Sequence, residues 1–221
     1  MSRSPEPLVD REFALRRTAG NRVGAPRADT GTVIIDVGRA RAVAGRGPGA
    51  HVRGAARRAS ELAATVPEND RELLVRAAWP HDVGYAEPLR DSGFHPLDGA
   101  RSLERDGWPR RLVGLVAHHS GASLVAGVLG LEDELARYPR EDGPVADALT
   151  HADRTTGPTG RRVSVPDRLA EVLRRHGPGS PNALAHPVRA PRLLAIADRV
   201  ERRLTRLEAV PATGKPGPDH W

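Results

Sequence analysis

Apolar residues recur at spacings of three and four along most of the chain beyond residue 50, which is the period of an α-helix with one buried face. Breaks that contain glycine or proline separate these stretches, for example at Gly107 and at Gly143-Pro144. The pattern predicts helices over residues 51–66, 69–79, 97–106, 109–119, 121–129, 144–155, 166–176 and about 190–207. The predicted fold class is therefore all-α, a bundle of helices around a core of Ala, Leu and Val.

Several histidines and aspartates fall on the apolar faces or at the ends of these predicted helices, where side chains are expected to be buried. His51 heads a stripe that continues through Ala55 and Ala59, and Asp153 follows Leu149 by four positions. The residues that share this placement are His51, His81, Asp82, His118, His119 and Asp153. An unpaired imidazole or carboxylate is costly to bury, and a shared metal ion would remove that cost. The sequence thus predicts a metal site among the central helices.

The candidate ligands mix imidazole nitrogens with carboxylate oxygens, and the chain has no cysteine. Such a set suits a divalent transition metal, Mn, Fe, Co, Ni or Zn, bound as one or two ions, whereas an all-oxygen set would suggest Mg or Ca. A metal of this kind lowers the pKa of its bound water, in favourable cases to roughly 7, and polarises a phosphoryl oxygen. Hydrolysis of a phosphate ester is the natural use of such a site.

The order of these residues, a His, a His-Asp pair and a distant Asp on successive helices, resembles the HD superfamily of metal-dependent phosphohydrolases over roughly residues 45–180. Segment 93–100 and the pair His118-His119 resemble the extra histidines of members that bind two metals. The resemblance implies a first metal held by His51, His81, Asp82 and Asp153. It implies a second metal held by His95 and His118, with Asp82 bridging the two ions. His119 would then lie beside the metals or face the substrate phosphate, although the two adjacent histidines could exchange roles.

The resemblance implies an enzyme that hydrolyses a nucleotide or another small phosphate ester or anhydride with metal-activated water. Asp82 and His119 are predicted to act in catalysis together with Glu87, which lies close enough after the His-Asp pair to shuttle a proton. Arg53 and Arg57, in the first turns after His51, are predicted to bind the substrate phosphate through their forked donors. The alternatives are an ordinary loop position for Glu87 and a solvated helix face for the two arginines.

Two other functions remain open at this level. The same set of residues serves binuclear iron oxygenases of the superfamily, so the ligand types alone do not exclude oxygen activation. A non-catalytic domain that senses a ligand is the third possibility. The completeness of the predicted ligand set argues against it, because binding alone would not require all of these residues.

Composition divides the chain of 221 residues and adds little about its partners. Residues 1–46 are rich in Arg, Gly and Pro and are predicted to be a flexible leader, followed by an HD domain over 47–185 and by a C-terminal helix and loose tail over 186–221. Lys215 is the one lysine, so the positive charge comes almost entirely from arginine. Residues 1–50 carry nine Arg against five acidic residues, an excess of four, which leaves only two of the net charge of +6 for the rest of the chain. The predicted catalytic region is thus nearly neutral. Nucleic acid is therefore not an expected partner, and the oligomeric state stays open.

The sequence predicts no membrane anchor. The aliphatic run at residues 32–37 is interrupted by Asp36 and is far shorter than the roughly 20 apolar residues that a spanning helix needs. A cytoplasmic location is expected on this ground.

Overall fold

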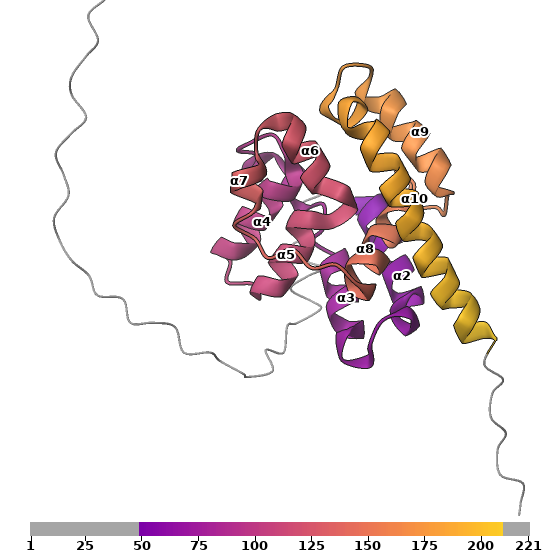
Figure 1. Ribbon diagram of the computed structural model, residues 1–221. Coiled ribbons are helices and arrows are strands. Elements are labelled where there is room, and N and C mark those ends of the chain that lie inside the picture. Colours follow the sequence, from indigo (N-terminus) through magenta and orange to yellow (C-terminus); the bar gives the residue numbers. More distant parts are fainter. Residues whose placement is uncertain (1–48, 210–221) are drawn as a thin grey trace, which may run out of the picture. The chain divides into compact units, whose positions relative to one another are not determined.

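The computed structural model describes residues 49–209, and every regular element within that range is helical (Figure 1). The α-helices are α2 (Gly49–Glu61), α3 (Arg71–Ala78), α4 (His95–Arg105), α5 (Arg110–His118), α6 (Ala122–Leu129), α7 (Glu132–Leu135), α8 (Pro144–Arg154), α9 (Val165–His176) and α10 (Pro181–Glu208). Short 3₁₀ turns connect them at Ala63–Thr65, Glu68–Asp70, Val83–Tyr85, Glu87–Leu89 and His119–Gly121. The predicted all-α class is confirmed. The predicted leader, residues 1–46, and the tail from residue 211 lie outside the described residues.

Helix α8 runs through the middle of the described domain. Ala148, Leu149 and Ala152 on this helix are almost completely buried, and α8 packs against α2, α3, α9 and α10 (Figure 1). The largest fully buried side chains around it are leucines, as the low aromatic content of 3% predicts. Because α8 ends at Arg154, its last turn carries Asp153 into this interior.

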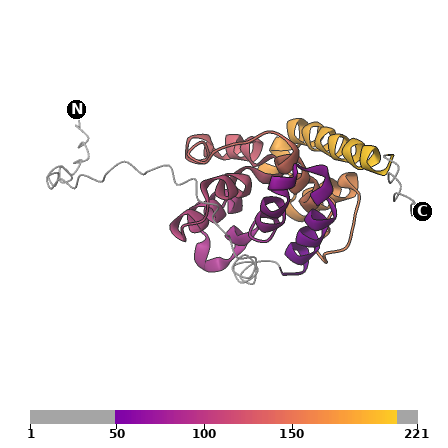
Figure 2. The same ribbon diagram turned by 90° about the horizontal axis from the view of Figure 1, so that it is seen from below.

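Helix α10 begins earlier than its apolar pattern predicts. It starts at Pro181, with the Ser180 hydroxyl accepting a hydrogen bond from the Ala183 N–H at 3.2 Å, and it continues through Pro187 and Pro191. Interior prolines normally end a helix because they remove a donor and clash with the preceding turn. Here the helix packs along α6, α8 and α9 on one side of the bundle (Figure 2), and this packing holds it together. The domain boundary predicted after residue 185 therefore falls inside one helix.

The stretch Arg110–Leu129 is apolar and long enough, by length and composition, to be a candidate membrane span. Its most apolar window is 61% buried within the domain. The stretch is not one continuous helix, because the helical conformation breaks between α5 and α6, where Ser120 has a φ of 54°. Leu112, Val116 and Ala126 from this stretch belong to the main hydrophobic core. Its apolar character is accounted for by packing inside the domain.

Two glycines allow close approaches that shape the interior. A Cβ on Gly54 would lie 2.5 Å from the carbonyl oxygen of Gly160, so only glycine lets α2 pack directly on the turn after α8. A Cβ on Gly84 would collide with the carbonyl oxygen of His95 at the start of α4. These contacts bring the segments that carry His51 and His95 toward the centre of the domain.

We expect Gly84→Ala to destabilise the fold and Gly127→Ala to leave it intact. The Cβ at position 84 meets rigid backbone, and overpacking of that kind costs about 1–3 kcal/mol, equivalent to a melting temperature lower by roughly 3–10 °C in a chain of this size. Gly127 lies on the exposed side of α6, where a Cβ would meet only the mobile Glu132 carboxylate at 3.1 Å. Thermal unfolding followed by circular dichroism measures both, and equal stability of the two variants would contradict the packing argument.

Candidate metal centre

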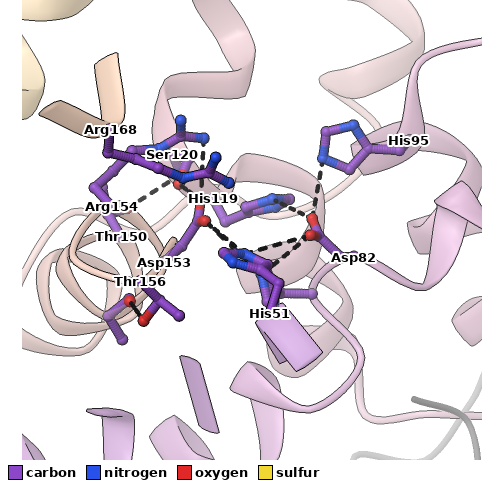
Figure 3. Close-up of polar contacts among 12 residues, drawn as sticks. His51, Asp82, His95, His119, Ser120, Thr150, Asp153, Arg154, Thr156 and Arg168 are labelled. Carbon is purple, nitrogen blue, oxygen red and sulfur yellow. Dashed lines mark hydrogen bonds and ion pairs between the residues drawn. The ribbon is translucent and has the colours of Figure 1, made fainter. Parts of the chain in front are cut away.

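Asp82 lies at the centre of a buried group of imidazoles. Its Oδ2 atom is 3.5 Å from His81 Nε2 and 3.6 Å from His51 Nε2. Its Oδ1 atom is 3.3 Å from His95 Nε2 and 3.7 Å from His119 Nε2 (Figure 3). The two oxygens of one carboxylate therefore face two different pairs of histidines.

Asp153 joins the first pair. Its Oδ1 atom lies 3.1 Å from His51 Nε2 and 4.0 Å from His81 Nε2. The ligand atoms divide into two sets, each with all atoms within 4.8 Å of one another: the His51 group is His51, His81 and Asp153, and the His95 group is Asp82, His95 and His119. Atoms bound to one ion at roughly 2.1 Å lie about 3–3.5 Å apart, so both groups have nearly the spacing that a metal requires.

The hydrogen bonds of the imidazoles indicate what the centre can bind. His81 Nδ1 donates to the Ala78 carbonyl at 2.8 Å, His119 Nδ1 donates to the Val116 carbonyl at 2.6 Å, and His51 Nδ1 bonds the Gly157 carbonyl at 3.2 Å. Because a carbonyl only accepts, each neutral ring carries its proton on Nδ1 and presents a lone pair at Nε2. His81 Nε2 is buried without a hydrogen-bond partner. Lone pairs that face carboxylates require a cation between them, and a divalent metal fits this requirement.

The protonation states agree with this reading. Burial opposes the ionisation of Asp82, but its contacts with the imidazoles of His81, His119 and His95 outweigh burial and hold the pKa of Asp82 well below its usual range. Asp153 behaves alike, since Arg154 and His51 overcome the effect of burial and keep its pKa low. Burial lowers the pKa of His81 and lowers that of His95 to about 4. His51 differs, because the hydrogen bond and the charge of Asp153 outweigh burial and raise its pKa. Ionised carboxylates beside the neutral rings of His81 and His95 are in the states that bind metals, and a metal would displace the proton of His51.

Each candidate ligand sits where a helix begins or ends. His51 lies in the first turn of α2, His81 and Asp82 follow α3 after Pro80, His95 starts α4, and Asp153 is in the last turn of α8. The placement of these residues at helix ends on apolar faces agrees with the sequence analysis. All except His95 are less than 10% exposed, and His95 is held by Tyr85, whose ring stacks on it with 3.9 Å between centroids.

The predicted roles of the adjacent histidines are corrected. His118 Nε2 donates to the Tyr138 carbonyl at 3.0 Å, and His118 belongs to neither group, so the prediction that it holds the second metal with His95 is wrong in this geometry. His119 occupies that place instead. Both residues follow the same apolar stripe, and the choice between them depends on the end of α5, which closes at His118 and is followed by the left-handed turn at Ser120 and Gly121.

Ser120 is part of the centre and was not expected from the sequence. Its hydroxyl donates to Asp153 Oδ2, and its backbone N–H donates to the Thr150 hydroxyl at 3.2 Å. Its carbonyl accepts from Arg189 Nε at 2.9 Å and from Arg189 Nη2 at 2.7 Å. A non-glycine residue at φ 54° is strained by about 1–3 kcal/mol, and these contacts keep it there. No periodicity or motif in the sequence distinguishes this serine from an ordinary turn residue.

The centre opens into a cavity of about 530 Å³. Its lining includes four of the candidate ligands, His51, Asp82, His95 and Asp153, and the side chains Tyr85, Glu87, Arg90, Arg154, Arg168, Arg175 and Arg189. Glu87 is exposed at this cavity, which is compatible with its predicted role. Burial, aided by the charge of Asp82, raises the pKa of Tyr85 to about 12, so it remains a neutral phenol.

The arginines predicted to bind phosphate are not at the cavity. Arg57 is exposed and donates to the Gly160 carbonyl at 3.3 Å, and Arg53 is exposed on the same helix; neither residue lines the cavity. Both extend from the outer side of α2, whereas His51 faces inward. The arginines that do line it come mainly from α8, α9 and α10. Those of α9 and α10 lie beyond the candidate ligands in sequence, and no motif marks them.

The geometry makes His119, not His118, the residue on which the His95 group depends. We expect His119→Gln to weaken binding of one equivalent of Mn²⁺ or Ni²⁺ at least tenfold, because a coordinating nitrogen is lost. The matched variant His118→Gln should bind as wild type does. The affinity of each variant for the metal is measured by its metal content and by the metal-induced rise of its melting temperature. Loss of one metal from His118→Gln alone would restore the original assignment.

The family model of the HD domain matches residues 49–157. No curated protein and no solved structure matches the chain. The matched range begins with α2 and ends shortly after Asp153, so it contains every member of the His51 and His95 groups and excludes α9 and α10. HD domains typically bind divalent metals, as these groups could. Residues 49–157 of the chain are therefore an HD domain.

Proposed function

We propose that the chain is a metal-dependent phosphohydrolase that cleaves a small phosphate ester or anhydride, such as a nucleotide. The HD domain indicates a superfamily of metal-dependent hydrolases. The observation that carries the proposal is the shared carboxylate of Asp82, whose two oxygens face two sets of imidazoles, at the edge of a cavity lined by arginines.

In this proposal the His51 group and the His95 group would each hold one divalent ion, and one oxygen of Asp82 faces each set of imidazoles. A divalent metal bound there supplies a water of lowered pKa and polarises a phosphoryl oxygen. The protein contributes the geometry: the rings of His51, His81 and His119 are held by backbone carbonyls, so their Nε2 atoms stay aimed at the centre without reorganisation.

Arg154 is the arginine best placed to contact the phosphoryl group that is cleaved. Its Nη2 atom lies 3.0 Å from Asp153 Oδ2, its side chain is 9% exposed, and its Nε is buried without a hydrogen-bond partner. A fixed guanidinium beside the centre stabilises the negative charge that grows on the phosphoryl oxygens during attack. Glu87, exposed at the mouth of the same cavity, can carry a proton to the departing group.

The alternatives make different predictions. A binuclear iron oxygenase would be coloured when loaded with iron and would consume oxygen with its substrate. A sensing domain would bind a ligand without turnover. The arginine-lined cavity supports an anionic substrate, and a phosphatase screen across nucleotides with several divalent ions, run beside an oxygen electrode and elemental analysis, separates the three functions.

Asp82→Asn should lower phosphatase activity by roughly 100-fold or more under saturating metal, because the amide removes the charge and one of the oxygens that face the two groups. The helical signal in circular dichroism should persist, since packing of the apolar core supplies most of the stability. Arg57→Ala, on an exposed residue outside the cavity, is the matched control and should keep full activity.

Glu87→Gln should have a smaller effect than Asp82→Asn. If Asp82→Asn keeps most of the activity while Glu87→Gln abolishes it, water activation does not depend on the carboxylate shared by the two groups.

A further inference from the structure

One wall of the cavity is built by α9 and α10, beyond the residues that match the HD domain. Arg168, Arg175 and His176 come from α9, and Asn182 and Arg189 come from α10. Apart from Val172, the contribution of these helices to the lining is polar. The composition of this wall is a property of this chain and is not dictated by the metal-binding residues.

Arg189 is a buried cation whose described hydrogen-bond partners are all neutral. Only 7% of the residue is exposed, and its guanidinium donates to the Ser120 carbonyl and, at 2.8 Å, to Asn182 Oδ1. Burial, with repulsion from Arg154, lowers its pKa to about 9, which leaves it charged at neutral pH. A buried charge normally has a counter-ion, and none of these partners is one.

Arg168 and Arg175 share a single carboxylate. Arg168 pairs with Glu171 through Nη1, and Arg175 Nε lies 3.7 Å from the other oxygen of Glu171. The side chain of Arg168 is 6% exposed, and its Nε atom is buried without a hydrogen-bond partner. Figure 3 shows Arg154 and Arg168 together on the side of Asp153 that is away from Asp82 and His95. Positive charge is thus concentrated on one side of the metal centre.

The cleaved phosphoryl group does not neutralise this charge. Two divalent ions between Asp82 and Asp153 leave two positive charges, which already balance a phosphate dianion. The guanidinium groups of Arg154, Arg168, Arg175 and Arg189 then exceed Glu171 by three charges. With a single ion the excess is one charge, still positive. Forked guanidinium donors are suited to phosphate and carboxylate oxygens.

We propose that Arg168, Arg175 and Arg189 bind a second anionic group of the substrate, so that the protein acts on small phosphate esters that carry another phosphate or a carboxylate besides the phosphate that is cleaved. A cavity of about 530 Å³ accommodates a metabolite of this size. The proposal rests on the proposed phosphohydrolase function for the reaction, but binding of the second anion depends only on the arginines.

Binding is tested on the full chain without metal. Methylenediphosphonate, which is not hydrolysed, should raise the melting temperature of the EDTA-treated protein, and Arg175→Gln should weaken its binding in calorimetry roughly tenfold. The Arg175 side chain is 46% exposed, so this substitution leaves the packing of α9 intact. Arg174→Gln, on the exposed neighbour that does not line the cavity, is the matched control and should bind as wild type does.

Catalysis is tested with matched substrates on the metal-loaded protein. Glycerol 2-phosphate carries one anionic group, 3-phosphoglycerate adds a carboxylate, and 2,3-bisphosphoglycerate adds both a carboxylate and a second phosphate. The KM should be at least roughly tenfold lower for the two substrates with an additional anion than for glycerol 2-phosphate. In Arg175→Gln the KM values of the three substrates should become nearly equal, whereas Arg174→Gln should keep the difference. Comparison of the last two substrates separates carboxylate from phosphate recognition.

The two proposals fail in different ways. Phosphatase activity with equal KM values for all three substrates, and no binding of methylenediphosphonate, would overturn the second-anion site and leave the hydrolase intact. Arginine-dependent binding of methylenediphosphonate without hydrolysis of any phosphate ester would support the anion site and overturn the proposed function.

Discussion

The burial of two ionised carboxylates, Asp82 and Asp153, is the constraint around which this structure is arranged. Both are less than a tenth exposed, and a buried carboxylate is tolerated only among cations or hydrogen-bond donors. Among the imidazoles around them, those of His81 and His119 turn Nδ1 toward backbone carbonyls and therefore present lone pairs, which do not neutralise a carboxylate. A bound divalent metal satisfies both sets of groups together, and the chemistry proposed for the protein follows from that requirement.

Hydrogen bonds link this centre to the C-terminal helix α10. Arg189 of α10 holds the carbonyl of Ser120, whose hydroxyl holds Asp153, so a residue outside the HD match supports a candidate ligand inside it. The same guanidinium contributes positive charge to the cavity. Helix α10 therefore stabilises the geometry of the centre, and α9 and α10 together bring positive charge to the cavity, where we propose that the substrate preference arises.

Much of the fold was predictable from local pattern. Spacings of three and four identified the helices from α2 to α6, α8 and α9, because each buries a single face and its termini carry Gly or Pro. The short α7 was not predicted, since four residues carry no periodicity. The early start of α10 was also not predicted: Pro187 and Pro191 disfavour helix locally, and only contacts with α6, α8 and α9 outweigh that preference.

The sequence by itself pointed to the candidate ligands. His51, the pair His81-Asp82 and Asp153 could be named because polar residues at helix ends and on apolar stripes require partners, and His95 could be named through the resemblance to the HD superfamily. Tertiary structure alone decided which of His118 and His119 faces the centre: His118, the last residue of α5, bonds the Tyr138 carbonyl, whereas His119 leaves the helix and faces Asp82. It also decided that Arg53 and Arg57 lie outside the cavity while Arg168 and Arg189 line it. Periodicity records which face of a helix is buried, whereas the partners across the interior depend on how helices distant in sequence pack together.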